Sequence, residues 1–448
     1  MEKIQLKELY NKGLEMHHIT NTAYPLTPGS FRNYKVTGED NIRKLLINDL
    51  KKIKELSLYV HIPFCKSRCK FCEYAVVSGE DANQKDKYVE YLLREIDMYK
   101  ELIGNKKIVG LDVGGGTPTQ LPSADLKRIT DHIRETFNFG KFEMSIETTP
   151  IIAANEPEKM KELYEIGYRR ISMGIQTISP TLLESFGRDG SVNIYKKAID
   201  NIRAAGFEKF NIDLMYGFLN QSLEEFESTI KYAISVNPEY ITLYRNRYKG
   251  TQIVKEAEHV TLAKVNAQYA RAYELLNESG YSGNSGKNTF SRVSGDYGTS
   301  DYLTKRVIKG TPYVGFGLGA QSFGYQYLAY NEGAASKGLK TYFEKLDANK
   351  LPLQDIYDLP IDEAIAKMVS VAFYFGFVDL KEFKKRFHLE FTEYFKKDIA
   401  FLKSKKLIYF RDNRMYINGD GTENIGGVIP MFYSLQSKQE LFKLKGVF

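Results

Sequence analysis

Residues 58–74 read LYVHIPFCKSRCKFCEY, and this stretch decides which fold and which chemistry the rest of the chain must support. Its apolar, β-branched beginning predicts a strand over Leu56–Ile62. Cys65, Cys69 and Cys72 follow directly and are the only cysteines of the chain. An odd, clustered set cannot form a disulfide framework, and clustered thiols in a reducing compartment indicate a metal site.

The spacing of these cysteines, C-x3-C-x2-C, suits a [4Fe–4S] cluster in which one iron has no protein ligand. That open iron can chelate the amino and carboxylate groups of S-adenosylmethionine. An electron from the cluster then cleaves a carbon–sulfur bond and gives a 5′-deoxyadenosyl radical. A structural zinc site is the alternative, but it normally needs a fourth ligand, for which His61 is the nearby candidate. We therefore predict a cluster held by Cys65, Cys69 and Cys72.

After this stretch, short apolar runs alternate with longer segments of helical periodicity. Further strands are predicted over Ile108–Val113, Phe142–Ile146, Ile171–Ile175, Phe210–Met215 and Tyr240–Tyr244. The helices between them are predicted over Lys87–Ile103, Leu126–Thr136, Pro157–Ile166, Asn193–Ala205 and Leu223–Val236. Because helical crossovers return the chain to the same end of a sheet, these strands should run parallel. The sequence therefore predicts an α/β fold, a partial (β/α)6 TIM-like barrel with ligands at the C-terminal ends of its strands.

Four parts of the chain differ in pattern. They are an N-terminal arm or lid (1–50), the barrel (51–250), a barrel extension and substrate-pocket segment (251–355) and a C-terminal helical, winged-helix-like domain (356–448). We expect the arm around Tyr24-Pro25 and the Gly- and Tyr-rich stretch Gly283–Tyr302 to shape the substrate pocket. The C-terminal domain is predicted to contain a β-hairpin around Asp412–Asn413.

The composition is that of an ordinary globular protein, with 448 residues, 43% of them hydrophobic, and a formal net charge of +7. Lysines are scattered through amphipathic stretches, so a solvated helix surface is favoured over a nucleic-acid-binding face. No apolar run approaches about 18 residues, and the N-terminus lacks an apolar signal core. We expect a cytoplasmic protein that binds no nucleic acid and has no membrane span.

Further motifs follow the other predicted strands. In VGGGTPT (113–119), glycines let the backbone approach a ligand closely, and we expect exposed amides that suit a carboxylate. Glu147 in SIETTP offers a carboxylate for ribose hydroxyls or an ammonium group. SMGIQT presents Gln176, FGR presents Arg188, and NIDLMYG presents Asp213. All of these lie where the carboxyl ends of the strands should meet.

Together the motifs resemble the radical S-adenosylmethionine superfamily, and the flanking residues narrow the resemblance to the oxygen-independent coproporphyrinogen III oxidase-like family. It runs from about Leu56 to Gly217 and continues more weakly to the C-terminal domain. The resemblance implies that Tyr59, Gly115 and Glu147 contact the S-adenosylmethionine bound at the cluster, with Tyr59 near its sulfonium and counted among the catalytic residues. It implies a second S-adenosylmethionine site, lined by Phe71, Gly116, Thr117, Gln176, Arg188 and Asp213. Tyr244-Arg245 matches a further position at the second site, and Gln321 one near the first.

The two residues after Cys72 bear on the reaction. Oxidases of this family usually carry another cysteine where this chain has Tyr74, and the related haem chaperones usually have Asp-Phe where it has Glu73-Tyr74. The retained second-cofactor positions resemble those of class C radical methyltransferases, related cyclopropane-forming enzymes and anaerobic haem-degrading methyltransferases. We therefore favour transfer of a methyl or methylene group from the second S-adenosylmethionine to an sp2 carbon of a flat, unsaturated small molecule, aromatic or tetrapyrrole. The alternatives are oxidative decarboxylation of coproporphyrinogen III and a non-catalytic haem chaperone.

Two further participants follow from that chemistry. The resemblance implies an electron donor of flavodoxin or ferredoxin type. Methyl transfer also needs a base that removes a proton, for which His17, His18 and Glu73 are the candidates.

Overall fold

The structure is a computed structural model that describes residues 4–20, 24–79 and 81–445. Residues 21–23 of the expected arm therefore lie outside the described residues. At the centre is a curved sheet whose parallel strands follow one another in chain order: β1 (Glu55–Ile62), β4 (Lys107–Gly115), β5 (Met144–Thr148), β6 (Tyr168–Gln176), β7 (Lys209–Tyr216) and β8 (Tyr240–Arg245). Each crossover places the next strand beside the last, as right-handed βαβ connections do. The predicted partial barrel is confirmed.

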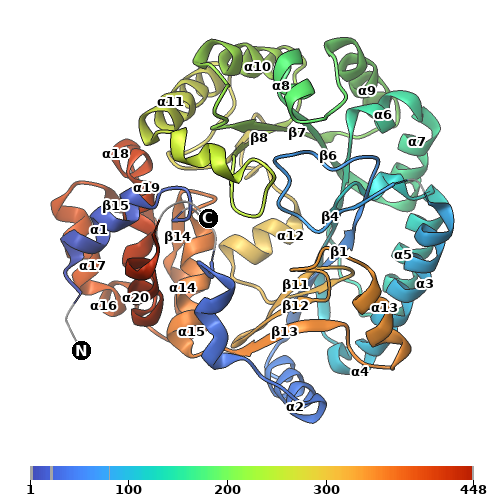
Figure 1. The fold of residues 1–448 in the computed structure, drawn as a ribbon, viewed down its shortest axis with the longest axis horizontal. Helices are drawn as coiled ribbons and strands as arrows, with labels where there is room; N and C mark the ends of the chain where they lie inside the picture. Colours follow the sequence, from blue (N-terminus) through green and yellow to red (C-terminus); the bar gives the residue numbers. More distant parts are fainter. Residues whose placement is uncertain (1–3, 21–23, 80, 446–448) are drawn as a thin grey trace.

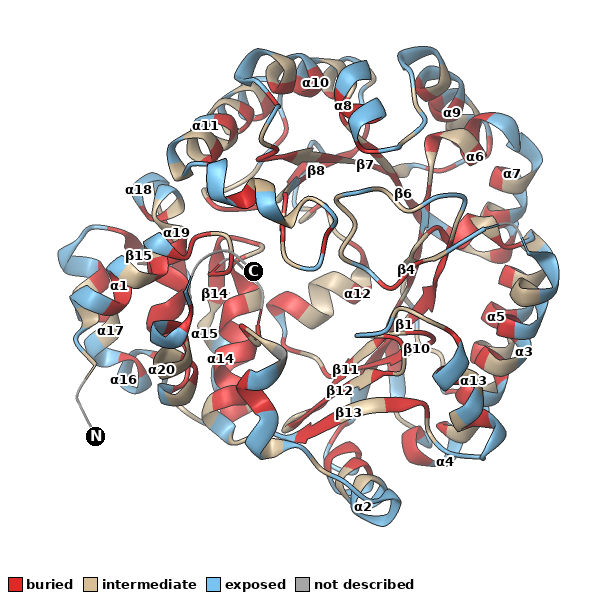
Figure 2. Cartoon of the chain, viewed as in Figure 1, coloured by how far each residue is buried: buried red, intermediate tan, exposed pale blue. Residues whose placement is uncertain are grey.

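Helices cover the convex face of this sheet (Figure 1). They are α3 (Ala82–Met98), α4 (Lys100–Ile103), η2 (Pro118–Gln120), α5 (Ser123–Thr136), α6 (Pro150–Asn155), α7 (Pro157–Ile166), α8 (Pro180–Ser185), α9 (Val192–Ala204) and α10 (Leu223–Ser235). Figure 2 shows the buried residues, coloured red, concentrated on the strands and on the helix faces turned towards them. The helix predicted over Lys87–Ile103 is in fact α3 followed by α4, because Tyr99 ends the first helix.

Additional strands extend the sheet at both edges. Next to β1 come β10 (Tyr313–Phe316), β11 (Gln321–Phe323), β12 (Tyr327–Asn331) and β13 (Leu353–Asp358), and beside β8 lies β9 (Thr289–Ser291). Only β10 of these is parallel to its neighbour in the barrel. Across the described residues the sheet has 11 strands and stays open, with β13 and β9 as its two edges.

One segment of the extension lies inside the arc of strands (Figure 1). It consists of α12 (Asp301–Leu303) and the π-helical turn η4 (Thr304–Ile308), and α12 contacts β4 and β1. Gly110 of β4 makes this approach possible, because a Cβ at that position would lie 2.7 Å from the Cα of Tyr302. The extension thus reaches the interior of the barrel. Its outer helices are η3 (Val254–His259), α11 (Leu262–Glu278) and α13 (Lys340–Asp347).

The C-terminal region forms a second, largely helical core. Its elements are α14 (Ile361–Ala372), β14 (Phe377–Asp379), α15 (Leu380–Phe387), α16 (Phe391–Tyr394), α17 (Lys396–Ser404), β15 (Ile408–Arg411), β16 (Arg414–Ile417), α18 (Gly419–Glu423), α19 (Ile425–Val428), η5 (Ile429–Phe432) and α20 (Leu435–Lys443). The hairpin β15–β16 turns at Asp412 and Asn413, which have φ angles of 50° and 58° as a tight two-residue turn requires. The predicted hairpin is confirmed.

The N-terminal arm consists of α1 (Leu6–Glu15), η1 (Pro28–Tyr34) and α2 (Glu39–Leu50). It packs against this second core through α1 and η1, whereas α2 contacts α4 and β12. α1 contacts α19, η5 and α20, and a Cβ on Gly13 would lie 2.3 Å from the carbonyl oxygen of Gly426. The first and last parts of the chain are therefore held together.

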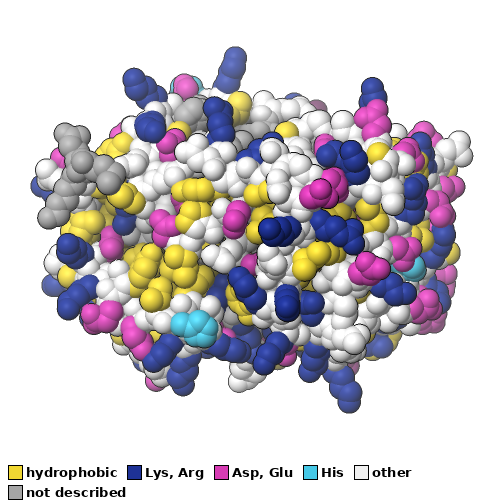
Figure 3. Space-filling model, turned by 90° about the horizontal axis from the view of Figure 1, so that it is seen from below, with side chains coloured by type: hydrophobic (Ala, Val, Ile, Leu, Met, Phe, Trp, Pro, Cys, Tyr) yellow, Lys and Arg dark blue, Asp and Glu magenta, His cyan; other side chains and the backbone are white. Residues whose placement is uncertain are grey.

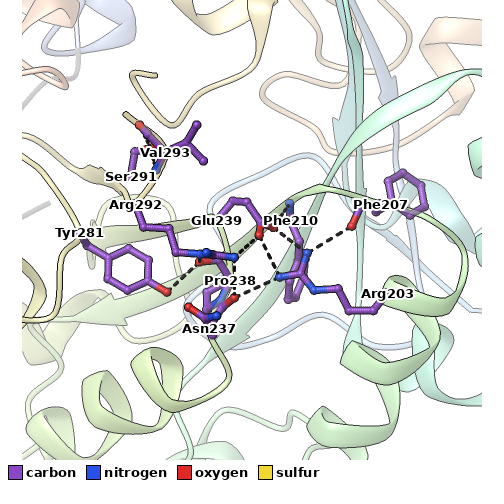
Figure 4. A network of polar contacts seen from close by, with 10 residues as sticks. All are labelled: Arg203, Phe207, Phe210, Asn237, Pro238, Glu239, Tyr281, Ser291, Arg292 and Val293. Carbon is purple, nitrogen blue, oxygen red and sulfur yellow. Dashed lines mark hydrogen bonds and ion pairs between the residues drawn. The ribbon is translucent and has the colours of Figure 1, made fainter. Parts of the chain in front are cut away.

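A buried ion network lies at the amino end of β8 (Figure 4). Glu239 pairs with Arg203 of α9 at 2.7 Å and with Arg292, which follows β9. Its Oε2 also accepts a hydrogen bond from the backbone N–H of Phe210 at 3.1 Å. With its side chain 10% exposed, Glu239 is fully partnered, as buried charges must be, so the network ties β9 to the barrel.

The outer surface carries charges of both signs. On the face seen in Figure 3, Lys and Arg side chains are interspersed with Asp, Glu and hydrophobic side chains. None of the described helices is both long enough and apolar enough to cross a bilayer.

Candidate active site

A single cavity of about 1240 Å³ opens at the carboxyl ends of the parallel strands. Every residue that the sequence predicted for the site lines it: Tyr59, Cys65, Cys69, Phe71, Cys72, Gly115, Gly116, Thr117, Glu147, Gln176, Arg188, Asp213, Arg245 and Gln321. The candidate bases His17 and His18 are not among the described residues that line the cavity, whereas Glu73 is. The structure therefore brings positions from eight different segments to one space.

The loop that carries the cysteines is fixed at several points. It begins in β2 (Phe64–Cys65), which pairs with β3 (Val77–Ser78). The backbone N–H of Lys70 donates to the carbonyl of Phe186 at 3.1 Å, and the carbonyl of Lys70 accepts from the N–H of Gln252 at 2.9 Å. The loop is thus held between the β6–β7 and β8–α11 connections, where the barrel presents its other predicted ligands.

The three thiols are free and partly exposed to the cavity. Cys65 Sγ lies 3.4 Å from Thr117 Oγ1, and Arg188 Nη1 lies 3.6 Å from Cys69 Sγ. Burial raises the pKa of the Cys65 thiol to about 11, and a bound metal would displace that proton. The three free thiols are soft donors that suit iron, and the guanidinium of Arg188 beside Cys69 suits the negative charge of an iron–sulfur cluster.

A zinc site fits less well, because its candidate fourth ligand is engaged. His61 is 4% exposed, and its Nε2 lies 2.8 Å from the carbonyl oxygen of Ala75, which can only accept a hydrogen bond. Its Nδ1 faces the hydroxyl of Tyr59 at 3.4 Å. In the described part of the chain, no three His, Cys, Asp or Glu side chains are placed to hold one metal ion. A cubane imposes no such convergence, since each of its thiolates binds a different iron.

The glycine loop acts through close packing, which corrects the expectation of free amides. The N–H of Gly115 donates to Glu147 Oε2 at 3.2 Å, that of Gly116 to the carbonyl of Ile62 at 2.9 Å, and that of Thr117 to the carbonyl of Phe64 at 2.8 Å. A Cβ on Gly116 would lie 2.7 Å from the carbonyl oxygen of Pro63. The amides are therefore used to hold the cysteine loop against β4, and only glycine fits between them.

Two predicted carboxylates face each other across the cavity. Burial, and next the charge of Asp213, raise the pKa of Glu147 to about 8. Asp213 accepts hydrogen bonds from Ser172 Oγ at 2.8 Å and Asn211 Nδ2 at 2.7 Å, which oppose the rise that burial causes in its pKa. Of the two carboxyl groups, Glu147 is therefore the one whose ionised form a cationic ligand would stabilise more.

The side chain of Gln176 has an unused acceptor. Gln176 ends β6 with a φ of 71°, in the left-handed region that is strained for a side-chain-bearing residue. Its Oε1 is buried without a hydrogen-bond partner among the described residues. Arg188 is oriented beside it by a hydrogen bond to the carbonyl of Gly174. Strain and an orphaned acceptor at one cavity-lining position are typical of a ligand site.

The remaining predicted residues have protein partners. Arg245 donates to His17 Nδ1, and burial, Arg245 and His18 together lower the pKa of His17 to about 3. Gln321 accepts from Tyr313 and donates to Tyr330 Oη at 2.9 Å. Phe71 packs against the rings of Phe186 and Phe218, with centroid separations of 5.1 and 5.7 Å.

Sequence reasoning missed several cavity-lining residues. Among them are Asp112, Arg247, Arg306, Lys337 and Lys367. Glu73, a candidate base, forms an ion pair with Arg247, which occupies its carboxylate group. Asp112 lies in β4, and the other four residues come from loops, η4 and α14, where no recurrent motif marks them.

Comparison with known proteins agrees with this geometry. Residues 59–233 match the model of the Radical SAM superfamily, which is the part containing the cysteines and the strand-end residues. Over 404 residues the chain is 26% identical to the oxygen-independent coproporphyrinogen III oxidase of Helicobacter pylori, covering 85% of this chain and 86% of that protein. The Escherichia coli protein of the same name is 28% identical over 364 residues, 78% of each chain. A heme chaperone, HemW of Haemophilus influenzae, is 30% identical over 201 residues, 44% of this chain and 52% of that protein.

The fold has a solved counterpart. The structure described as coproporphyrinogen III oxidase (HemN) from Escherichia coli, a radical SAM enzyme, superposes with a TM-score of 0.75 at 25% identity, covering 92% of this chain and 96% of the other. The likeness therefore extends through the barrel, its extension and the C-terminal region. Residues 59–233 therefore form a radical S-adenosylmethionine domain, whose cofactors are a [4Fe–4S] cluster and S-adenosylmethionine, and the chain as a whole is similar to the coproporphyrinogen III oxidases.

Proposed function

We propose that this radical S-adenosylmethionine enzyme oxidatively decarboxylates propionate side chains of a tetrapyrrole of the coproporphyrinogen III type. The observation that carries the proposal is the match, along most of both chains, to proteins named coproporphyrinogen III oxidases. This reading replaces the methyl transfer that the sequence alone favoured. The haem-chaperone alternative has less support, because that relative aligns with 44% of this chain.

The proposal assigns the cavity residues to two cofactor sites. Cys65, Cys69 and Cys72 hold the cluster, Tyr59, Gly115, Glu147 and Gln321 hold the S-adenosylmethionine at it, and Phe71, Gly116, Thr117, Gln176, Arg188, Asp213 and Arg245 hold a second molecule. When bound, the cluster supplies the electron that cleaves S-adenosylmethionine, and with it the capacity to remove a hydrogen atom from the substrate. The electron donor is proposed to be a flavodoxin or ferredoxin type of protein. A cavity of about 1240 Å³ exceeds the roughly 300–1,000 Å³ usual for one ligand, which supports more than one occupant.

The side chains have distinct tasks in this scheme. Glu147, which forms no ion pair with the described residues, balances the ammonium group of S-adenosylmethionine, and that group favours the carboxylate form of Glu147. The free Oε1 of Gln176 accepts a hydrogen bond from a cofactor donor group. The apolar cluster of Phe71, Phe186 and Phe218 excludes water from the edge of the cysteine loop, which protects a reactive radical.

The test is a product analysis. Anaerobically reconstituted protein is incubated with reductant, coproporphyrinogen III and S-adenosylmethionine labelled with 13C in its methyl group. Each propionate that becomes a vinyl group loses CO2, one hydrogen atom, which ends in 5′-deoxyadenosine, and one electron, for which the assay includes an oxidised one-electron acceptor. We expect products lighter by CO2 and one hydrogen atom for each such group, free of 13C, with 5′-deoxyadenosine released. Products that retain every carboxylate would refute the proposal.

Methyl transfer is the second candidate, supported by Tyr74. This residue stands where the oxidases usually have a cysteine, and its ring is 53% exposed with no hydrogen-bond partner among the described residues. The same assay distinguishes the two reactions, because methyl transfer predicts 13C in the product and S-adenosylhomocysteine beside 5′-deoxyadenosine.

A further inference from the structure

An arginine without a counter-anion projects into the cavity from the barrel extension. Arg306 belongs to η4, a π-helical turn, and such turns occur frequently at functional sites. Its Nη1 donates to the hydroxyl of Tyr302 at 3.2 Å, and its guanidinium lies 4.4 Å from the centre of the Tyr313 ring. No carboxylate among the described residues forms an ion pair with it. Its Nε and Nη2 are therefore the donors that remain for a ligand.

A lysine from the C-terminal region lines the same cavity. Lys367 is 4% exposed and lies in α14, whose other buried residues are apolar except for Glu363 and Ser370. Its Nζ donates to the carbonyl oxygen of Tyr24 at 2.8 Å and, within the described residues, has no carboxylate partner. Burial, and next the charges of Arg306 and Arg247, lower the pKa of Lys367 to about 7. Lys367 therefore lies within electrostatic reach of two other cations.

The nearby carboxyl groups do not neutralise these charges. Glu73 is paired with Arg247, and Lys337 donates to the backbone carbonyl of Glu73 at 2.8 Å. Asp112 also lines the cavity, but its Oδ2 accepts from Ser300 Oγ at 2.6 Å and burial raises its pKa to about 7. Glu363, one turn before Lys367 on α14, is buried and accepts hydrogen bonds from Tyr24, Ser434 and Ser437 instead. The buried Lys367 and the partly buried Arg306 thus have no ion-pair partner among the described residues. Such groups are costly unless an anion arrives to pair with them.

The neighbouring wall of the cavity is aromatic. Tyr74 and Tyr244 are 53% and 38% exposed, and both line the cavity. Tyr59 stacks on Tyr302, the residue that holds Arg306, with ring centroids 5.9 Å apart. Aromatic faces beside unpaired cations match a flat molecule that carries carboxylates at its rim.

We propose that Arg306 and Lys367 form an anion subsite that binds a carboxylate of the substrate. The inference rests on the proposed function for the identity of that substrate, a tetrapyrrole with propionate side chains. The planar guanidinium can donate two parallel hydrogen bonds to one carboxylate, while the ammonium adds a point charge. The subsite joins the extension to the C-terminal region through the ligand. It also fixes which edge of the ring faces the cofactors.

The test is a binding measurement that needs no turnover. Coproporphyrin III, the stable oxidised form with four carboxylates, is titrated into the cluster-loaded full chain and followed by fluorescence anisotropy. R306Q and K367M are expected to bind it about 10- to 100-fold more weakly, as loss of a hydrogen bond to a charged group predicts. R306K should fall between wild type and R306Q. The tetramethyl ester should bind weakly to the wild type, with no further loss in R306Q.

The matched control is K305Q, which removes the same charge from the same turn at a side chain that is not among the described cavity-lining residues. It should bind coproporphyrin III like the wild type. S-adenosylmethionine affinity, iron content and unfolding temperature are measured for every variant. R306Q that binds coproporphyrin III as tightly as wild type would overturn the subsite, as would absence of binding to the wild type. An equal loss of S-adenosylmethionine affinity in R306Q would assign the arginine to the cofactor instead.

These outcomes are separable from those of the product analysis. Methylated products together with Arg306-dependent porphyrin binding would refute the decarboxylation and leave the subsite standing. Decarboxylated products with unchanged binding by R306Q would do the reverse.

Discussion

The cavity has two walls of different origin. One wall, the cofactor wall, consists of strand-end residues from β1 to β8 that follow one another along the chain, such as Cys65, Gly116 and Glu147. The other, the substrate wall, is assembled from η4, α14 and the arm, and includes Arg306 and Lys367. The cofactor wall is built by local sequence motifs on a repeating βα unit, so related proteins can keep the same cofactor chemistry there. The second depends on how distant segments pack, so it is where substrate choice can vary.

The largest expected effect is on the cofactor wall. Cys65→Ala should abolish retention of a [4Fe–4S] cluster and reduce S-adenosylmethionine cleavage at least about a thousandfold, because three thiolates are needed to hold the cube. Iron and sulfide analysis after anaerobic reconstitution measures this directly. R306Q, on the substrate wall, should keep the full iron content. A variant lacking Cys65 that retains four irons would remove the distinction between the walls.

A smaller effect is expected at the glycine loop. A Cβ at position 116 would meet the backbone of Pro63 and Phe64 at 2.7 to 2.9 Å, and backbone cannot easily move aside. Gly116→Ala should therefore lower the free energy of unfolding by about 1–3 kcal/mol and weaken S-adenosylmethionine binding. Gly338→Ala is the matched control, since nothing lies within 4 Å of its Cβ position. Equal urea-unfolding midpoints for the two variants would contradict the packing role.

Glu147 should make cofactor binding depend on pH. Its pKa of about 8 in the empty site means that the carboxyl is protonated at pH 6 and 7, and a cationic ligand must displace that proton. The affinity for S-adenosylmethionine should therefore rise as pH increases towards 8, by at most about tenfold per pH unit. Isothermal titration should show proton release that disappears in E147Q. Glu90→Gln, at an exposed carboxylate outside the cavity, should leave the profile unchanged.

The smallest effect is expected from Tyr74→Cys, which restores the residue usual in the oxidases. The exposed ring of Tyr74 has no hydrogen-bond partner among the described residues, so stability should change by less than about 0.5 kcal/mol. Coproporphyrin III binding should weaken only a few-fold, through loss of one aromatic face. Product analysis of this variant should still give vinyl groups. A switch in product would instead locate the choice of reaction at this position.

The two walls also differ in how far the sequence predicts them. Strand-end residues such as Gln176 and Asp213 could be placed because alternating apolar runs define the strands and parallel strands share one carboxyl edge. The prediction that the amides of the glycine loop are free to bind a ligand was wrong. The amides of Gly116 and Thr117 instead donate to the carbonyls of Ile62 and Phe64, a tertiary contact that the local sequence does not reveal. Strand β5 begins at Met144, two residues after the prediction, since Phe142 packs on Phe139 before the strand starts.

The substrate wall left weaker signals in the sequence. Lys367 interrupts the apolar run of α14, and a lysine in such a helix, like Glu363 one turn earlier, is a local sign of a buried ionisable group. Arg306 lies in a turn whose position inside the barrel follows from Gly110, almost 200 residues earlier in the chain, and no periodicity reveals that contact. Residues assembled over such distances become visible only when the fold is known.

The most direct test of the account is the response of the reduced cluster to S-adenosylmethionine. Anaerobically reconstituted protein is reduced, titrated with S-adenosylmethionine, and followed by electron paramagnetic resonance and by chromatography of the nucleoside products. The account predicts a [4Fe–4S] signal that shifts on cofactor addition, followed by formation of 5′-deoxyadenosine, and loss of both in Cys65→Ala. A reconstituted cluster whose signal does not change with S-adenosylmethionine, with no 5′-deoxyadenosine formed, would contradict it.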